Sequence, residues 1–165
     1  MKLVVILALS SAIWPHPAAA QSINQREASA TAKIEGSRGR YDGTFTGTGI
    51  ASVCGEIPQE SSITGVATFV VEYPSDDPGA VPIQSISFGS IELVGGKTAA
   101  SAFRLTALVR KPDGGRPPGY VLNTEGDRAR NTGTATLTKS PGALTLKVRG
   151  SNDMGERIDL VLTCK

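Results

Sequence analysis

The sequence predicts an all-β fold, namely an antiparallel β-sandwich, or alternatively a small closed β-barrel, of about seven to nine strands with one disulfide. Three observations carry this prediction. Apolar and polar residues alternate in run after run beyond the N-terminus, Gly- and Pro-rich turn signals separate these runs, and the chain has only two cysteines. No helical periodicity is sustained, so nothing favours an alternating strand–helix pattern with a parallel sheet.

The alternating runs give the expected strands and their inward faces. The clearest run, Arg157–Cys164, alternates Ile158, Leu160, Leu162 and Cys164 with mostly polar residues. Strict alternation indicates a strand with one buried face. The other clear runs are 44–54, 63–73, 83–94, 102–111 and 143–149, with weaker ones at 120–123 and 133–139. Run 83–94 keeps a single apolar face only if a bulge near Gly89 exchanges its two sides.

The connections contain residues suited to turns. Pro141-Gly142, Asn152–Gly155 and Gly95-Gly96 supply the restricted or positive φ angles that tight turns need. Longer connections are expected at 74–82, 112–119 and 124–132.

The N-terminus predicts export. Lys2, an apolar run over 3–13 and Ala18-Ala19-Ala20 match a secretory signal peptide over 1–20. An uncleaved membrane anchor is the alternative, but the apolar run is well short of the roughly 20 residues that span a bilayer. Cleavage after Ala20 of the 165 residues leaves 145, and no later segment is apolar enough to cross a membrane as a helix. We expect a periplasmic or secreted protein with one domain over 40–165. Residues 21–39 are expected to form a disordered tail or an edge strand using Ala28, Ala30, Ala32 and Ile34.

The two cysteines, Cys54 and Cys164, are expected to form the disulfide, because exported chains meet an oxidising environment. Such a bond places their strands side by side or face to face across the core, since the Cα atoms must lie within about 7 Å. Free thiols are the alternative.

Charge and composition exclude several function classes. The signal segment contains Lys2 but no acid, so its removal lowers the formal charge from +2 to +1, which argues against a nucleic-acid binder. It also contains His16, the only histidine. Without histidine, neither a Ser-His-Asp or Cys-His nucleophile nor an imidazole zinc site can be built. We therefore expect no metal and no cofactor.

Carboxylates are the remaining catalytic candidates. A pair drawn from Glu56, Glu60, Glu72 and Glu92 could act as general acid and base in a hydrolase, although solvent-facing strand residues explain the same pattern. A Ser-Lys dyad is the other arrangement that needs no histidine.

Two further motifs have ordinary interpretations. Gly95–Thr98 resembles the end of a phosphate-binding loop, but the required earlier glycine is replaced by Ile91, so a turn is expected. Asp76-Asp77 has too few acids to specify a calcium site and fits an Asx-type turn.

Two surface features are the candidate binding sites. Arg104, Arg110, Lys147 and Arg149 would form a basic stripe if their strands share one sheet, and such a stripe attracts an anionic polysaccharide or phospholipid headgroup. A solvated charged face is the alternative. The Pro- and Gly-rich loop 111–119 holds Arg116 exposed and stiffened, as a recognition loop would, unless it is a plain connection.

The sequence thus favours a non-enzymatic binding module with an extracytoplasmic partner of unknown identity. A pilus- or surface-type structural subunit, in which the strand around 28–34 adds to a neighbour, is the alternative. A carboxylate-based hydrolase ranks third.

Overall fold

The computed structural model describes residues 26–36, 42–57, 66–73, 83–110, 119–126 and 130–165. The predicted signal peptide, Glu60, Asp76-Asp77 and Arg116 lie outside these residues.

The protein is all-β, and the predicted antiparallel fold with one disulfide is confirmed. The described residues form ten strands in a single antiparallel sheet of order β5-β8-β9-β10-β1-β2-β3-β4-β6-β7. Their bounds are β1 Arg26–Glu35, β2 Gly43–Ile57, β3 Val66–Glu72, β4 Ile83–Ser90, β5 Ala99–Ala100, β6 Arg104–Val109, β7 Gly119–Asn123, β8 Thr132–Ser140, β9 Ala143–Ser151 and β10 Arg157–Cys164.

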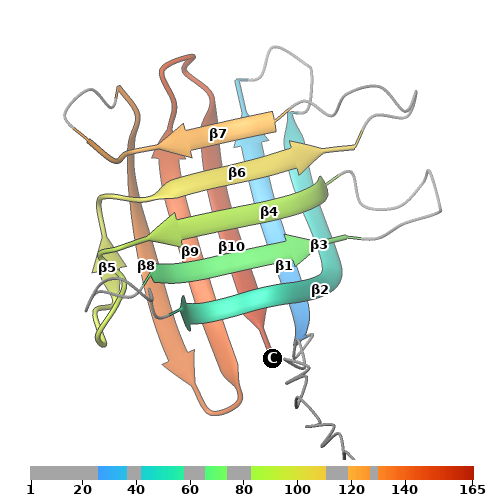
Figure 1. Ribbon diagram of the computed structural model, residues 1–165. Helices are drawn as coiled ribbons and strands as arrows, with labels where there is room; N and C mark the ends of the chain where they lie inside the picture. The colour runs from blue at the N-terminus through green and yellow to red at the C-terminus, as the bar shows by residue number, and fades with distance from the viewer. Residues whose placement is uncertain (1–25, 37–41, 58–65, 74–82, 111–118, 127–129) are drawn as a thin grey trace, which may run out of the picture.

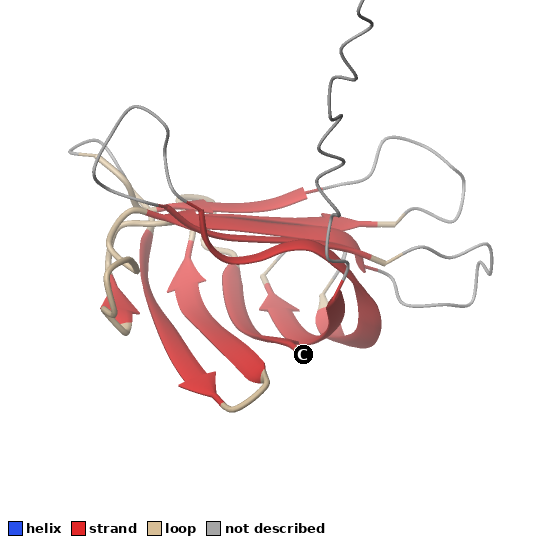
Figure 2. Ribbon diagram, turned by 60° about the horizontal axis from the view of Figure 1, so that its bottom comes forward, coloured by secondary structure: helices blue, strands red, loops and turns tan. Residues whose placement is uncertain are grey.

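The sheet curls into a half-barrel, so that one sheet supplies both walls around the core (Figure 1). Strands β3, β4, β6 and β7 form the front layer and β8, β9, β10 and β1 the back layer, and the two sets of strands cross steeply. Figure 2 shows the layers joined along the side where β2 bends from one into the other. The fold therefore shares its two facing walls with the predicted sandwich and its curled sheet with the alternative barrel.

Strand β2 turns the corner between the layers. Residues 43–51 pair with β1 in the back layer, whereas its last residues pair with β3 in the front layer. The register shifts between Ala51 and Val53, and Ser52 at this irregularity donates to the carbonyl of Val70 at 3.3 Å. An extra residue in one strand bends it and exchanges its faces. For this reason Cys54, which simple alternation places on the face opposite Phe45 and Ala51, reaches the interior.

Residues 26–35 are an interior strand, which corrects the expectation of a tail or an edge strand over 21–39. Strand β1 pairs with β10 on one side and β2 on the other. The proposed inward residues do face the core: Ala28, Ala32 and Ile34 are fully buried and Ala30 nearly so. Small alanines suit a position near the corner, where the two layers converge. Composition alone did not reveal that this strand has a hydrogen-bonded neighbour on each side.

The predicted strand 83–94 is wrong in two details, namely the residue at which the strand ends and the position of its bulge. Strand β4 stops at Ser90, and its irregularity lies between Ile83 and Ser85 rather than near Gly89. Beyond Ser90 the chain leaves the sheet, which explains how Leu93 is buried while Ile91 is 57% exposed. The change of face arises from the end of the strand and not from a bulge within it.

The two layers approach closely where Gly133 of β8 pairs with Gly150 of β9. A Cβ on Gly150 would lie 2.6 Å from the Leu122 side chain, and one on Gly133 would lie 3.0 Å from that of Phe103. Both side chains are fully buried and come from the front layer, since Leu122 belongs to β7 and Phe103 directly precedes β6. Glycine is therefore required here for contact between the walls and not for backbone freedom.

A polar cluster links β7 to the β9–β10 turn. The Tyr120 hydroxyl donates to the Glu156 carbonyl at 3.3 Å, and the Asn152 amide donates to the Glu156 carboxylate at 2.7 Å. The Asn152 side-chain oxygen accepts from the main-chain N–H of Met154 and of Glu156. Asn152 and Glu156 are buried, and these bonds offset the cost of removing them from water.

The predicted turns are confirmed. Ser140 pairs with Ala143 across the two-residue turn Pro141-Gly142, and Gly142 has φ +74°. The Lys97 N–H donates to the Val94 carbonyl at 3.2 Å, so Gly95-Gly96 forms a turn and not part of a phosphate-binding loop.

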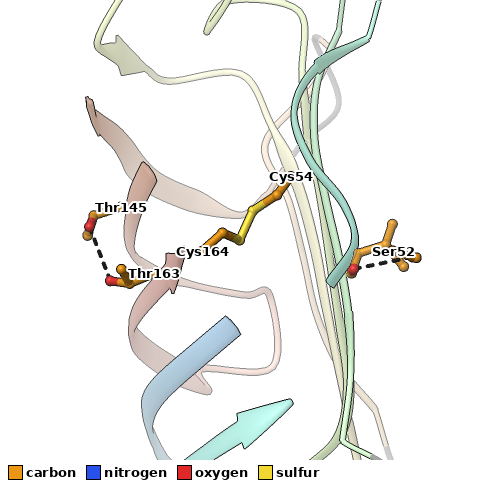
Figure 3. The surroundings of a disulfide bond; sticks show 6 residues. Ser52, Cys54, Thr145, Thr163 and Cys164 are labelled. Atoms are coloured by element: carbon orange, nitrogen blue, oxygen red, sulfur yellow. Dashed lines mark hydrogen bonds between the residues drawn. A yellow bond between two sulfur atoms is a disulfide. The ribbon is translucent and has the colours of Figure 1, made fainter. Parts of the chain in front are cut away.

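The disulfide joins the front layer to the back layer beside the corner. Cys54 of β2 and Cys164 of β10 have Cα atoms 6.5 Å apart, and Cys164 is 1% exposed. Figure 3 shows the bond spanning the space between the two strands, with Ser52 pointing away from it. The bond closes a loop of 110 residues, which in the simple chain-entropy model destabilises the unfolded state by about 4–5 kcal/mol.

Removing the disulfide should lower stability without changing the fold. We expect Cys54→Ala with Cys164→Ala to reduce the free energy of unfolding by about 2–5 kcal/mol, measured by urea denaturation. Reductant should lower the wild-type midpoint and leave that of the double variant unchanged. A wild-type midpoint insensitive to reductant would contradict the assignment.

Gly150→Ala should lower the free energy of unfolding by about 1–3 kcal/mol, because the new Cβ meets Leu122 and the Thr132 carbonyl. Gly89→Ala is the matched control, since nothing lies within 4 Å of a Cβ there. We expect that control to be neutral or stabilising by up to about 1 kcal/mol. Equal losses in both variants would show that the walls do not touch at Gly150.

Candidate functional site

The structure does not bring the four predicted basic residues into one stripe. Arg104 begins β6 and Arg110 follows it, whereas Lys147 and Arg149 belong to β9. Five strands separate β6 from β9 in the sheet order. Because the sheet curls, the outer sides of these strands face away from each other on the two walls (Figure 2). The four residues form two separate pairs.

The pair on β6 is engaged in contacts within the front layer. Arg104 lies 3.8 Å from the Glu125 carboxylate, with its side chain 64% exposed. Arg110 donates to the main-chain carbonyl of Tyr73 at 2.6 Å and is half-buried. This contact ties the end of β6 to the end of β3, which is a structural use of the guanidinium.

Arg149 of the second pair lies in an open groove on the outer side of the back layer. The groove has a volume of about 490 Å³ and crosses β8, β9, β10 and β1 near one end of these strands. The described residues that line it include five charged ones, and the full set is Lys33, Glu35, Thr132, Gly133, Thr134, Arg149, Gly150, Ser151, Arg157, Ile158 and Asp159.

Charges alternate across the strands of this groove. Arg149, Asp159 and Lys33 are cross-strand neighbours in one row, and Arg157 and Glu35 are neighbours in the next. The Arg149 guanidinium lies 2.9 Å from the Asp159 carboxylate, and the Lys33 ammonium lies 2.6 Å from that of Glu35. Among the described residues of the groove, three cations thus face two anions, an excess of one positive charge.

Electrostatics within the groove favour the ionised form of Glu35. The hydrogen bond from Lys33, and then the charges of Lys33 and Arg157, hold the pKa of the Glu35 carboxyl below its usual value. Exposed ion pairs contribute little to stability, because water competes for both partners. The cations of the groove therefore remain able to exchange their partners for those of a ligand.

Hydroxyl groups border the cations. Thr132 and Ser151 approach each other at 3.1 Å between side-chain oxygens, and Thr134 lies directly cross-strand from Arg149. Lys147, the remaining residue of the predicted stripe, lies one row further along β9, opposite Thr136. The groove and its margin thus present both cationic and neutral hydrogen-bond donors.

Lys33 and Arg157 were missed as site residues by the sequence interpretation. Alternation does place Lys33 opposite the inward face of Ala28–Ile34, and it places Arg157 opposite that of Ile158–Cys164. What alternation cannot give is strand order. Only the insertion of β1 beside β10 brings Lys33, Arg157 and Arg149 to one place.

The described carboxylate candidates do not form a facing pair. The Glu92 carboxylate accepts from the main-chain N–H groups of Ser101 and Ala102 at 2.6 and 2.9 Å. The Glu56 carboxylate accepts from the Gly95 N–H at 3.3 Å. Both side chains thus hold the segment that connects β4 to β6, while Glu72 is exposed on β3. The bonds to Ala102 and Ser101 lower the pKa of Glu92 below its usual value.

Within the described ranges, no three His, Cys, Asp or Glu side chains gather as a metal site would require. In the same residues no helix has the length and apolar character needed to cross a membrane.

A second hollow of about 460 Å³ lies where the short β5 leaves the rest of β8 uncovered, and Lys97 and Lys139 are among its lining residues. Lysine at an exposed sheet edge disfavours pairing with another strand.

Comparison with protein families, with curated protein sequences and with solved structures finds no match to this chain.

The structural role of Glu92 predicts a pH-dependent effect of Glu92→Gln. A lowered pKa means that ionised Glu92 stabilises the fold above about pH 4.5 and that this stabilisation is lost as the pH falls through the folded-state pKa. At pH 7 we expect the variant to unfold at lower urea concentration than the wild type, with the gap narrowing in acid. Glu72→Gln, on the exposed side of β3, is the control. A gap that stays constant with pH would contradict this role.

Proposed function

We propose that the protein is an exported, non-enzymatic binding module whose back-layer groove holds an anionic ligand, either an acidic glycan or a lipid headgroup. The observation that carries the proposal is the convergence of Lys33, Arg149 and Arg157 in one groove with hydroxyl donors around them.

The proposed mode of binding is an exchange of partners. Carboxylate, sulfate or phosphate groups on a ligand would replace Asp159 and Glu35 beside the two arginines, whose planar guanidinium groups suit bidentate contact with such anions. The arginines lie on adjacent strands and in adjacent rows. A ligand with negative groups repeated along its length therefore fits this site better than a single small ion.

Affinity should depend on charge and hydrogen bonding rather than on stacking. In the part of the chain that the structure describes, no aromatic side chain lines the groove. Contacts of this kind are exposed to water, so binding should be moderate and should weaken as salt is added.

The disulfide is consistent with a location outside the cytoplasm, where such bonds persist. An acidic glycan and a lipid headgroup are both available there. The proposal of export rests on the predicted signal segment over 1–20 together with this bond.

The structural-subunit alternative receives less support. Strand β1, which includes the segment expected to add to a neighbour, already pairs with β10 and β2 over most of its length. Donating it would require opening both ladders. The hydrolase alternative is weakened in a different way, because Glu56 and Glu92 are committed to main-chain N–H groups.

The test uses the mature chain with acidic and neutral polysaccharides, and with vesicles containing anionic or only zwitterionic lipids. We expect binding to one acidic class, weakened by salt, and a loss of about tenfold or more in Arg149→Gln with Arg157→Gln, as expected for charge-assisted hydrogen bonds. Lys97→Gln with Lys139→Gln, which removes two cations from the separate hollow beside β5, is the matched control and should bind like the wild type.

Two results would overturn the proposal. One is the absence of binding to every acidic polysaccharide and anionic vesicle tested. The other is binding that Lys97→Gln with Lys139→Gln weakens as much as the arginine double variant does, since that would place the contact outside the groove.

A further inference from the structure

We propose that the outer side of the front layer is the interface of a homodimer. This inference is independent of the groove, which lies on the outer side of the back layer. It rests on an uncharged row of side chains across the front layer and on the placement of the two charges that flank it.

The central row crosses the four strands of the front layer and the end of β2 that pairs with them. The register connects Val53, Val70, Ser87, Thr106 and Val121 as successive cross-strand neighbours from β2 to β7. Val121 is 45% exposed, and Val53 and Val70 are half-buried. No residue of this row is charged, whereas five of the described residues that line the back-layer groove are charged.

The rows on either side contain one charged residue each. In one flanking row the cross-strand neighbours on β3, β4 and β6 are Thr68, Gly89 and Arg104. In the other they are Glu72, Ser85 and Leu108. Arg104 approaches Glu125 only to 3.8 Å and remains well exposed, so its guanidinium is accessible to another partner. The three rows are thus low in charge and contain two opposite charges at defined places, while Glu125 lies beside Arg104 beyond the end of β7.

Arg104 and Glu72 lie symmetrically on opposite sides of Ser87. Strands β3 and β6 are the two neighbours of β4, and the two charged rows are the two neighbours of the central row. Arg104 and Glu72 are therefore displaced from Ser87 by one strand and one row in opposite directions. A two-fold axis that lies in the interface over Ser87, perpendicular to the line from Arg104 to Glu72, places Arg104 of each copy against Glu72 of the other.

A surface that complements itself in this way fits a second copy of the same chain, because a two-fold interface uses the same patch on both subunits. An acidic or a basic partner would match only one of the two charges. Two sheets packed face to face keep their side chains in contact at about 10 Å separation, which residues of valine and serine size can fill.

The size of the patch predicts a weak dimer. Five strands about 4.8 Å apart and three rows about 6.8 Å apart give a footprint of about 500 Å². This is below the roughly 800 Å² per partner of a standard stable interface. In such a dimer the two back-layer grooves face outward on opposite sides.

The first test measures the molar mass of the mature chain by sedimentation over a concentration series. We expect the wild-type mass to rise toward twice the monomer value and Ser87→Arg to remain monomeric, because the two new charges would meet near the axis. Ser87 is exposed on β4, so the substitution leaves the monomer core untouched. Ser29→Arg, exposed on the outer side of β1, is the matched control and should dimerise like the wild type.

The second test is a charge exchange. Glu72→Arg alone and Arg104→Glu alone should each weaken the dimer about tenfold or more, because each places like charges together. The combination of both should restore association to near the wild-type value, which a merely destabilised fold would not do.

The proposal is overturned if the wild type stays monomeric up to its solubility limit, or if its dimer is unaffected by Ser87→Arg. It is also overturned if the double exchange fails to restore association in a protein that remains folded. A face that instead binds vesicles lacking anionic lipid would identify an apolar partner in place of the second copy.

Discussion

The whole structure depends on the bend of β2, where one continuous sheet turns to form both walls of the core. A long antiparallel sheet cannot bury its apolar side alone, so it must either meet a second sheet or fold over on itself. Here the irregularity between Ala51 and Val53 provides the bend, and it also turns Cys54 inward toward Cys164. The disulfide fastens the two walls beside that bend, so one local feature determines the curvature, the enclosure of the core and the position of the covalent link (Figure 3).

The curl explains how the remaining contacts between the walls are made. Glycine at positions 133 and 150 lets Phe103 and Leu122 reach the backbone of the back layer. At β7 the Tyr120 hydroxyl and the buried Asn152 and Glu156 provide polar contacts in place of a further strand pairing. The protein thus surrounds its core by a covalent bond at the bend, by close packing over the glycines, and by buried hydrogen bonds at β7.

The curl also gives the protein two outer surfaces of different character. The back layer alternates positive and negative side chains across β9, β10 and β1, whereas the central row of the front layer is uncharged. Charged residues on exposed strand positions are expected for solubility alone, but their concentration on the back layer is not. The anion-binding groove and the homodimer interface proposed here follow from this division, and they place ligand binding and self-association on opposite sides of the molecule.

The sequence by itself determined the class of fold, the disulfide partners, the tight turns and the inward side of most strands, because alternation and turn residues act over a few neighbouring positions. Arg157–Cys164 is strand β10 with the predicted inward residues, and Pro141-Gly142 is the predicted turn. The order of the strands was decided only by the tertiary structure, since pairing joins residues far apart in the chain. It made 26–35 an interior strand, separated Arg104 and Arg110 from Lys147 and Arg149, and brought Lys33 and Arg157 beside Arg149. Which charges meet on a curled sheet depends on that order, and local patterns do not contain it.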